Sequence, residues 1–344
     1  MATTAAGPRV LPDAVEFVVA DEAGEYASVA LAQDLRRPRV GIPFVRDDGG
    51  WRLAFARPDV DRMEYLLELD GKLTADPANP LRAPAPFGDK SVVEWPEYDP
   101  PAWLDSMADE GPLEEIEIPC RRLVARVRVL LYGTPDPPAA DAPLIVAHDG
   151  PEYATYSRLT RFLDAMSWEE QIPPLRAALI QPVDRDETYS ASALYSAALV
   201  RELIPAISDR APHGIRIGMG ASLGALAMLH AQRRFPRSFD GLLLQSGSFF
   251  QRRWDRHEAR FTRFARINRF VGSVLRADGE SRAVPVGITC GTAEENLTNN
   301  RAVAAALERQ GYPVWVGEVR DAHNWTCWRD AFDPHLTMLI EAAT

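Results

Sequence analysis

Residues 215–230 read Ile-Arg-Ile-Gly-Met-Gly-Ala-Ser-Leu-Gly-Ala-Leu-Ala-Met-Leu-His, and they contain the most informative motif of the chain. An alternating apolar run stops at glycines around Ser222, and an Ala/Leu-rich pattern of helical type follows. Gly220–Gly224 thus matches Gly-x-Ser-x-Gly at the junction of a strand and a helix. Glycines on both sides leave no Cβ to collide where strand and helix nearly touch. The stretch predicts a strained turn that presents Ser222 as a nucleophile and directs the Leu223 N–H at a carbonyl oxygen; the alternative is a tight turn with an idle serine.

A serine hydroxyl is a poor nucleophile, so it needs a base and an acid that orients this base. In a strand-turn-helix site of this kind, the acid and then the histidine follow the serine along the chain. We expect His323 to be the base, because it follows the last predicted strand and precedes the last predicted helix. The strand before it ends at Gly291, and the next loop carries two adjacent glutamates, Glu294 and Glu295. The residues alone leave both open as the acid.

Two halves of the chain differ in pattern. Up to about residue 115, the pattern predicts a small β-sandwich, because short strands occur at 51–56 and 62–69. We interpret the proline-rich segment that follows them as a meandering edge or linker. From residue 116, strands alternate with helical patterns, which predicts an α/β fold with a mostly parallel sheet and helices on both faces. The predicted strands there are 116–119 and 123–132 as an antiparallel pair, then 144–147, 177–182, 215–219, 242–245, 284–289 and 314–319. We therefore expect two domains, 1–115 and 116–344.

Composition narrows the class of partner. The 344 residues carry a formal net charge of −11, which argues against nucleic acid as a partner because such binding needs a basic face. No apolar run of 18 residues or more occurs, and the first residues lack the pattern of a secretion signal, so we expect no membrane insertion and a cytoplasmic protein. Three widely spaced cysteines fit reduced thiols, and six scattered histidines predict no metal site and no cofactor.

The motifs resemble the esterase D/enterochelin esterase group of α/β-hydrolases, which is also similar to the antigen 85 mycolyltransferases. The segments that carry this resemblance are Asp149-Gly150, Gly220–Gly224, Phe235-Pro236, Gln245–Ser248, Gly291–Glu294 and His323–Arg329. The front half resembles the immunoglobulin-like N-terminal domain of enterochelin esterases through Tyr65–Asp70, Asp76–Pro80 and Ser91–Glu94. The resemblance implies serine-dependent hydrolysis of a carboxylic ester, without metal or cofactor, with enterobactin as the family's known substrate. It also implies that Glu294 is the acid.

Two departures from the family pattern concern the substrate site. Enterochelin esterases carry Arg-x-x-Glu-Leu-x-x-Asn after the second parallel strand; Arg185 is kept here, but Thr188 and Ser192 replace the Glu and the Asn. The resemblance therefore makes Arg185 a candidate substrate-binding residue with altered neighbours. The family's second oxyanion donor follows Asp-Gly, where this chain has Pro151, which has no N–H. Either the loop is shifted and Glu152 or Gly150 donates, with Glu152 preferred, or only the Leu223 donor remains.

Other segments near these motifs have two interpretations each. Trp325, together with Trp328, either lines a pocket for an aromatic acyl or catechol group or belongs to the core. An arginine-rich insertion between Ser248 and Ala283 has apolar residues at helical spacing. We interpret it as an amphipathic lid helix with arginines on its wet face; the alternative is a basic stripe that attracts an anionic substrate.

Taken together, the residues and the resemblance predict a serine carboxylesterase that acts on a small-molecule ester, with a siderophore ester and an acyl ester as the candidate substrates. Two alternatives stay open at this point. The enzyme could transfer the acyl group to an alcohol or thiol instead of water, or the chain could be a binding protein that kept the fold. The sequence indicates no oligomeric state.

Overall fold

The computed structural model describes residues 7–35, 41–279 and 282–344, and these form two compact units. One unit comprises residues 1–100 with two short segments from far along the chain, 291–294 and 320–327. The other contains the remaining residues. The predicted division into residues 1–115 and 116–344 stays a prediction.

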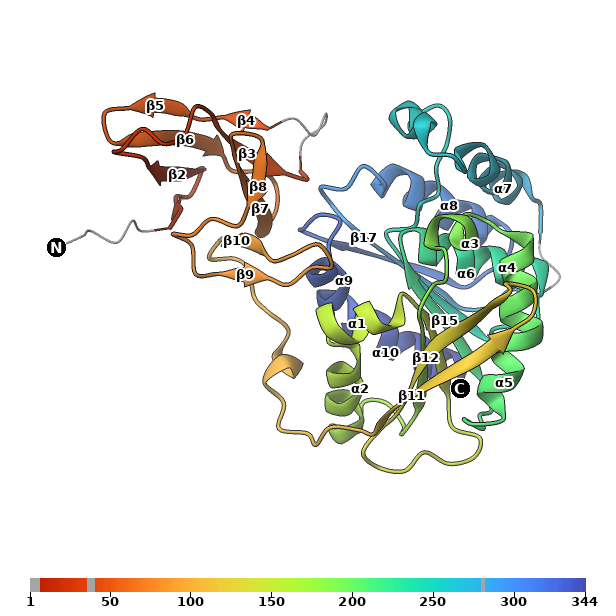
Figure 1. Cartoon of the computed structure of the whole chain (residues 1–344). Helices are drawn as coiled ribbons and strands as arrows, with labels where there is room; N and C mark the ends of the chain where they lie inside the picture. Colours follow the sequence, from red (N-terminus) through yellow and green to blue (C-terminus); the bar gives the residue numbers. More distant parts are fainter. Residues whose placement is uncertain (1–6, 36–40, 280–281) are drawn as a thin grey trace. The chain divides into compact units, whose positions relative to one another are not determined.

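The first unit is built of β-strands (Figure 1). Its strands are β1 (Arg9–Val10), β2 (Ala14–Ala20), β3 (Val29–Gln33), β4 (Ile42–Pro43), β5 (Val45–Asp47), β6 (Gly50–Ala56), β7 (Arg62–Leu69), β8 (Lys72–Thr74), β9 (Arg82–Ala83) and β10 (Lys90–Glu94). One sheet has the order β1-β2-β6-β5, and the other has the order β4-β3-β7-β10-β9 with β8 paired to β7. Side chains alternate between buried and less buried along β2 and β3, as a two-residue period requires.

Both sheets contribute to one apolar core. Phe17 of β2 and Tyr65 of β7 meet edge to face with their ring centroids 5.0 Å apart, and both side chains are almost fully buried. Two sheets thus enclose one core in this unit, as in the predicted β-sandwich; that this sandwich is immunoglobulin-like stays a prediction. The prediction for the proline-rich segment was wrong in one respect, because β10 is an interior strand of its sheet. Pro86 and Pro96 bracket this strand and leave its own N–H groups able to pair.

The second unit holds an eight-stranded sheet. Its strands, in the order β11-β12-β14-β13-β15-β16-β17-β18, are β11 (Leu113–Cys120), β12 (Ala125–Gly133), β13 (Leu144–His148), β14 (Arg176–Ile180), β15 (Arg216–Ala221), β16 (Gly241–Gln245), β17 (Val286–Gly291) and β18 (Val314–Val319). The sheet is mixed and only partly parallel, and the predicted antiparallel pair is found at its edge in β11 and β12. Strands β14, β13, β15, β16 and β17 run parallel, whereas β12 pairs antiparallel with both β11 and β14.

Helices connect the parallel strands. They are α1 (Gly150–Tyr156), α2 (Leu159–Trp168), α3 (Arg185–Tyr189), α4 (Ala193–Ala198), α5 (Ile204–Ser208), α6 (Leu223–Arg234), α7 (Phe264–Arg276), α8 (Leu297–Arg309), α9 (Trp325–Asp330) and α10 (Phe332–Ala343). Short 3-10 turns occupy η1 (Ala102–Asp105) and η3 (Arg256–Arg260), and a π-helical turn, η2 (Leu199–Leu203), joins α4 to α5.

The helices cover both faces of this sheet. Helices α1, α2 and α10 lie on one face, and α4, α5 and α6 lie on the other (Figure 1). On the first face, Phe162 of α2 and Phe332 of α10 pack with ring centroids 5.3 Å apart. Among the described residues, no helix is both long enough and apolar enough to cross a membrane. The covered parallel strands end in loops, and those loops carry the candidate site.

Candidate active site

Ser222 sits in the sharp turn between β15 and α6. Its backbone has φ 56° and ψ −122°, a conformation that is uncommon for a residue with a side chain. The flanking glycines make the turn possible, because a Cβ on Gly220 would lie 2.6 Å from the Gly224 backbone. A Cβ on Gly224 would crowd the side chain of His148 at 3.2 Å. The prediction of a strained turn that needs both glycines is thus confirmed.

The hydroxyl of Ser222 lies at the start of α6, beside a second serine. Ser222 Oγ and Ser248 Oγ are 3.0 Å apart, and the Ser248 N–H donates to the Ser222 carbonyl oxygen at 3.1 Å. The Ser222 N–H donates in turn to the carbonyl oxygen of Gln245, at the end of β16. Leu223 is the first residue of α6, where a backbone N–H has no partner inside the helix. The turn therefore offers a hydroxyl and an N–H donor at one end of a helix.

The loop after β16 is held by polar contacts. The indole of Trp328 donates to Ser246 Oγ at 2.8 Å, and the Gln245 side chain donates to the Trp328 carbonyl oxygen at 2.9 Å. The N–H of Gly247 donates to the side chain of Asn300 on α8 at 2.9 Å. Trp328 is thus a buried packing and hydrogen-bonding residue. Trp325, which begins α9, is half-buried.

His148 forms a hydrogen bond with the turn that carries Ser222, a role that the sequence did not predict. Its Nδ1 lies 3.0 Å from the carbonyl oxygen of Gly224, and its Nε2 lies 2.8 Å from the hydroxyl of Tyr195. Complete burial lowers the pKa of His148 to about 4, so the ring is neutral near pH 7. The Nδ1–H then donates to Gly224 and the Nε2 accepts from Tyr195. These partners lie 76 and 47 residues away, so no local pattern announces them.

The turn after β13 carries a buried carboxylate that is paired with a partly exposed arginine. Asp149 adopts φ 50° and precedes α1, and its carboxylate accepts two hydrogen bonds of 2.8 Å from the guanidinium of Arg185. Gly150 has no room for a side chain, because a Cβ would lie 2.2 Å from the Leu179 backbone. The candidate substrate residue Arg185 is therefore engaged with Asp149, while its side chain stays 38% exposed.

Pro151 and Glu152 occupy the first turn of α1. Glu152 is half-buried, and burial raises the pKa of its carboxyl above the ordinary value. The role of the Glu152 N–H as the second donor stays a prediction.

The acid and histidine candidates meet directly. Glu294 Oε2 lies 2.6 Å from His323 Nδ1, and Glu294 Oε1 accepts the Gly291 N–H at 2.8 Å. The Glu294 side chain is 1% exposed and that of His323 is 28% exposed. Glu294 lies three residues beyond the end of β17, and His323 lies four residues beyond the end of β18. This pair can hold an imidazole with its Nδ1 directed at a carboxylate.

Glu295 points to a different partner. Its carboxylate lies 2.9 Å from Nε2 of His257, whose side chain is 45% exposed. With Glu258, these residues form the one group in the described ranges that could bring three metal ligands together. Such acidic groups are common at surfaces, and no step of the chemistry below uses this one.

The arginine-rich insertion forms η3 and α7. Phe264, Ile267, Val271 and Val274 are buried along one side of α7, so the prediction of an amphipathic helix is confirmed. Arg266 anchors it to α3, because its guanidinium donates to the Glu187 carboxylate at 2.7 Å and to the Ser190 carbonyl oxygen at 2.6 Å.

Known proteins are similar to this chain in sequence and in fold. The family model described as "Putative esterase" matches residues 122–339. The iron(III) enterobactin esterase of Escherichia coli O6:H1 is 28% identical over 301 residues, which cover 84% of this chain and 72% of that protein. The crystal structure of the enterobactin esterase FES from Shigella flexneri in the presence of enterobactin superposes with a TM-score of 0.79 at 22% identity, covering 98% and 95% of the two chains. The ferric enterobactin esterase of Salmonella typhimurium gives 0.82 at 21% identity, covering 99% and 97%.

Proposed function

Because the chain belongs to the esterase family and is an ester-bond hydrolase, we propose that it cleaves a carboxylic ester with Ser222 as nucleophile, His323 as base and Glu294 as acid. The observation that carries this proposal is the backbone of Ser222, which holds a hydroxyl at the start of α6 in a strained turn. Strain of this kind persists at functional sites, where the surrounding structure enforces it.

The proposed reaction has two halves. Ser222 Oγ attacks the carbonyl carbon while its proton passes to His323 Nε2, since Nδ1 is directed at Glu294. The imidazolium then gives this proton to the departing alkoxide, which leaves an acyl-serine. A water molecule attacks the acyl carbon and gives a proton to Nε2. The bond between the acyl carbon and Ser222 Oγ then breaks, the imidazolium returns its proton to Oγ, and the acid leaves. Glu294 holds the tautomer and stabilises the imidazolium.

We further propose that the N–H groups of Leu223 and Glu152 stabilise the oxyanion. Each such donor contributes about 10²–10³ in rate. A phosphonate adduct at Ser222 tests the assignment: its oxygen should lie about 2.7–3.1 Å from both N–H groups. A contact to Leu223 alone would leave the oxyanion with one donor, and a contact to Gly150 would move the second role there.

As the substrate class we propose an ester of the catecholate siderophore type, because the named relatives are iron(III) enterobactin esterases. Arg185 and Trp325 are proposed to contact this substrate. Thr188 and Ser192, where the resembling enzymes carry Glu and Asn, serve their own helices instead. Thr188 donates to the Asp184 carbonyl oxygen at 2.5 Å, and Ser192 accepts from the Tyr195 N–H at 3.4 Å. The substrate therefore has to be held by other groups at this edge. We propose the cytoplasm as the compartment, since the three cysteines are buried and form no disulfide.

The test combines a fluorophosphonate probe with hydrolysis assays on iron(III) enterobactin, its linear fragments and p-nitrophenyl esters. We expect labelling at Ser222 and release of the free acid. Labelling without hydrolysis, together with acyl transfer to an added alcohol, would indicate a transferase. A folded protein that is not labelled and still binds the siderophore would indicate a binding protein.

A further inference from the structure

A buried arginine of the β-sandwich contacts the loop that carries His323. Arg62 is the first residue of β7, and its side chain is 4% exposed. Its Nη1 lies 3.4 Å from Asp321 Oδ2 and 3.0 Å from Glu64 Oε1. Asp321 is 259 positions further along the chain, two residues before His323, and belongs to the same compact unit. A strand of the sandwich thus reaches a residue next to the proposed base.

Asp321 organises the loop on both sides of His323. Its Oδ1 accepts hydrogen bonds from the Ala322 N–H at 2.6 Å and from the Asn324 side chain at 2.8 Å. Its backbone carbonyl oxygen accepts the Ala293 N–H at 3.2 Å, which ties the loop to the residue before Glu294. The backbone that positions the imidazole is therefore fixed mainly through one carboxylate.

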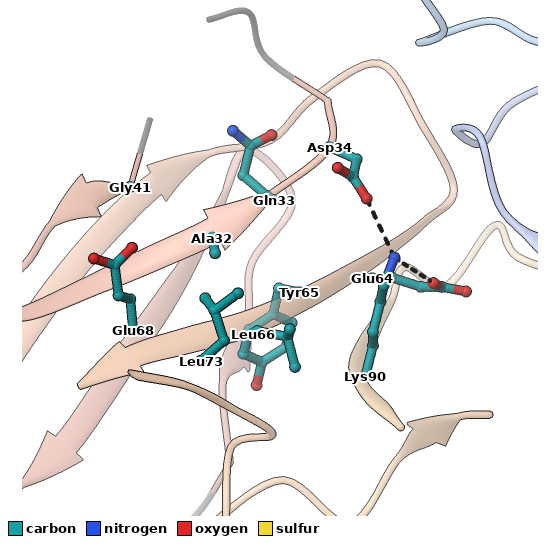
Figure 2. A pocket seen from close by; sticks show the side chains of 10 residues that line it. All are labelled: Ala32, Gln33, Asp34, Gly41, Glu64, Tyr65, Leu66, Glu68, Leu73 and Lys90. Atoms are coloured by element: carbon teal, nitrogen blue, oxygen red, sulfur yellow. Dashed lines mark hydrogen bonds and ion pairs between the residues drawn. The ribbon is translucent and has the colours of Figure 1, made fainter. Parts of the chain in front are cut away.

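Opposite charges alternate outward from this carboxylate. Arg62 lies between Asp321 and Glu64, and the other oxygen of Glu64 lies 3.4 Å from Lys90 Nζ. Lys90 in turn pairs with Asp34 at 3.2 Å (Figure 2). Lys90, Glu64 and Asp34 line a cavity of about 310 Å³ in the sandwich. Each buried charge in the row therefore has an opposite charge beside it.

Arg62 favours the ionised form of Asp321. Burial raises the pKa of Asp321, the positive charge of Arg62 acts in the opposite direction, and the pKa with both effects present is about 7. Without this guanidinium, two buried carboxylates, Asp321 and Glu64, would face each other with less compensation, and breaking a buried pair in this way is strongly unfavourable. The loop would relax to separate them or to admit a proton.

We propose that Arg62 is a positioning residue for the hydrolysis: through Asp321 it holds the 321–324 backbone so that His323 stays against Glu294. This inference rests on the proposed role of His323 as base. It assigns part of the catalytic geometry to the β-sandwich, without any contact between Arg62 and the reacting atoms.

A matched control joins the same two segments. Arg320 contacts Asp59 at 2.6 Å and Asp61 at 2.9 Å, but its side chain is 46% exposed. The backbone hydrogen bond from the Asp61 N–H to the Arg320 carbonyl oxygen survives any change of this side chain. Arg320→Gln therefore removes the ion pairs of this loop with Asp59 and Asp61, which precede β7. It leaves the contacts of the Asp321 side chain unchanged.

The experiment measures kcat and KM on a p-nitrophenyl ester, and melting temperature, in the full chain. The variants are Arg62→Gln, Arg62→Lys, Asp321→Asn, the double variant Arg62→Gln/Asp321→Asn, and Arg320→Gln. Misplacing a catalytic group by about 1 Å costs about 100-fold, so we expect Arg62→Gln to lower kcat by about 10-fold to 100-fold with KM nearly unchanged. Arg62→Lys should restore part of the loss, and Arg320→Gln should leave kcat unchanged. The effects of Arg62→Gln and Asp321→Asn should be non-additive, because both break one pair.

A folded Arg62→Gln variant with the wild-type kcat would overturn the inference, as would an equal loss in Arg320→Gln. If Arg62→Gln does not fold, Asp321→Asn carries the test, since asparagine keeps the Oδ1 acceptor for Ala322 and Asn324 and replaces only the oxygen that faces Arg62. Failure of the proposed function looks different: the wild-type protein itself would show neither labelling of Ser222 nor hydrolysis.

Discussion

Replacing Glu294 by glutamine tests the acid–histidine pair atom by atom. The wild-type carboxylate accepts two hydrogen bonds, from the Gly291 N–H at 2.8 Å and from His323 Nδ1 at 2.6 Å. A glutamine side chain has one acceptor and one donor, so it cannot accept both. Glu294→Gln must therefore either lose one of these hydrogen bonds or reverse the one to the imidazole.

Reversing the hydrogen bond to the imidazole costs less free energy than losing one of the two hydrogen bonds. With its oxygen kept on Gly291, the new NH₂ donates to His323 Nδ1, and both hydrogen bonds survive. The opposite orientation places NH₂ against the buried Gly291 N–H and costs about 1–3 kcal/mol. The variant therefore settles with the imidazole proton on Nε2, the nitrogen that has to accept the proton of Ser222. We expect kcat to fall by about 10³–10⁴, or about 4–5 kcal/mol of transition-state stabilisation.

Glu295→Gln is the matched control, because it changes the neighbouring residue in the same way. Its carboxylate faces His257, which is largely exposed, and such pairs are worth about 0.2–1 kcal/mol. Both variants are assayed for kcat on a p-nitrophenyl ester, with circular dichroism to verify folding. A Glu294→Gln variant within tenfold of wild type, or a larger loss in Glu295→Gln, would refute the assignment.

The other predictions concern the nucleophile, the ion pair between Asp149 and Arg185, and the buried His148. Ser222→Ala should abolish hydrolysis and change the free energy of unfolding by less than about 1 kcal/mol; more than a few per cent residual kcat contradicts the role. Arg185→Gln should destabilise the fold by about 1–3 kcal/mol in urea titrations, because it strands the buried Asp149 carboxylate, whereas the exposed Arg301→Gln should cost less than about 1 kcal/mol. The pKa of His148 is lowered to about 4 in the folded protein, so below pH 6.5 the unfolded chain binds more protons than the folded one. The free energy of unfolding should therefore fall by about 3 kcal/mol as the pH is lowered from 6.5 towards 4. His148→Gln should flatten this slope, and an unchanged slope would contradict the argument.

Local signals predicted much of the fold. The alternation of Arg62–Leu69 has a two-residue period, and β7 has these bounds. Gly220 and Gly224 announced the strained turn, because only glycine fits where strand and helix touch. The sequence did not reveal β10, since the four prolines before it and the three after it resemble a linker although none lies inside the strand.

Long-range contacts limited the prediction of the site. Glu294 and Glu295 are adjacent and chemically alike, so only the fold decides which one turns back to the Gly291 N–H and the imidazole. His148 had no local signal, because burial and distant partners define its role. Arg62 read as the first residue of an ordinary strand. Its partner in the histidine loop lies too far along the chain for any periodicity to connect them.

The 259 residues that separate Arg62 from Asp321 also have a consequence during synthesis. Domains fold as units from the N-terminus while a ribosome adds about 5–20 residues per second, so Arg62 waits about 13–50 s before Asp321 has been made. In this interval Glu64 neutralises its charge, since the two residues sit on the same strand and pair at 3.0 Å. The early strands can thus form without the late loop. The nascent protein gains the environment of its histidine only after residues 320–327 have been added.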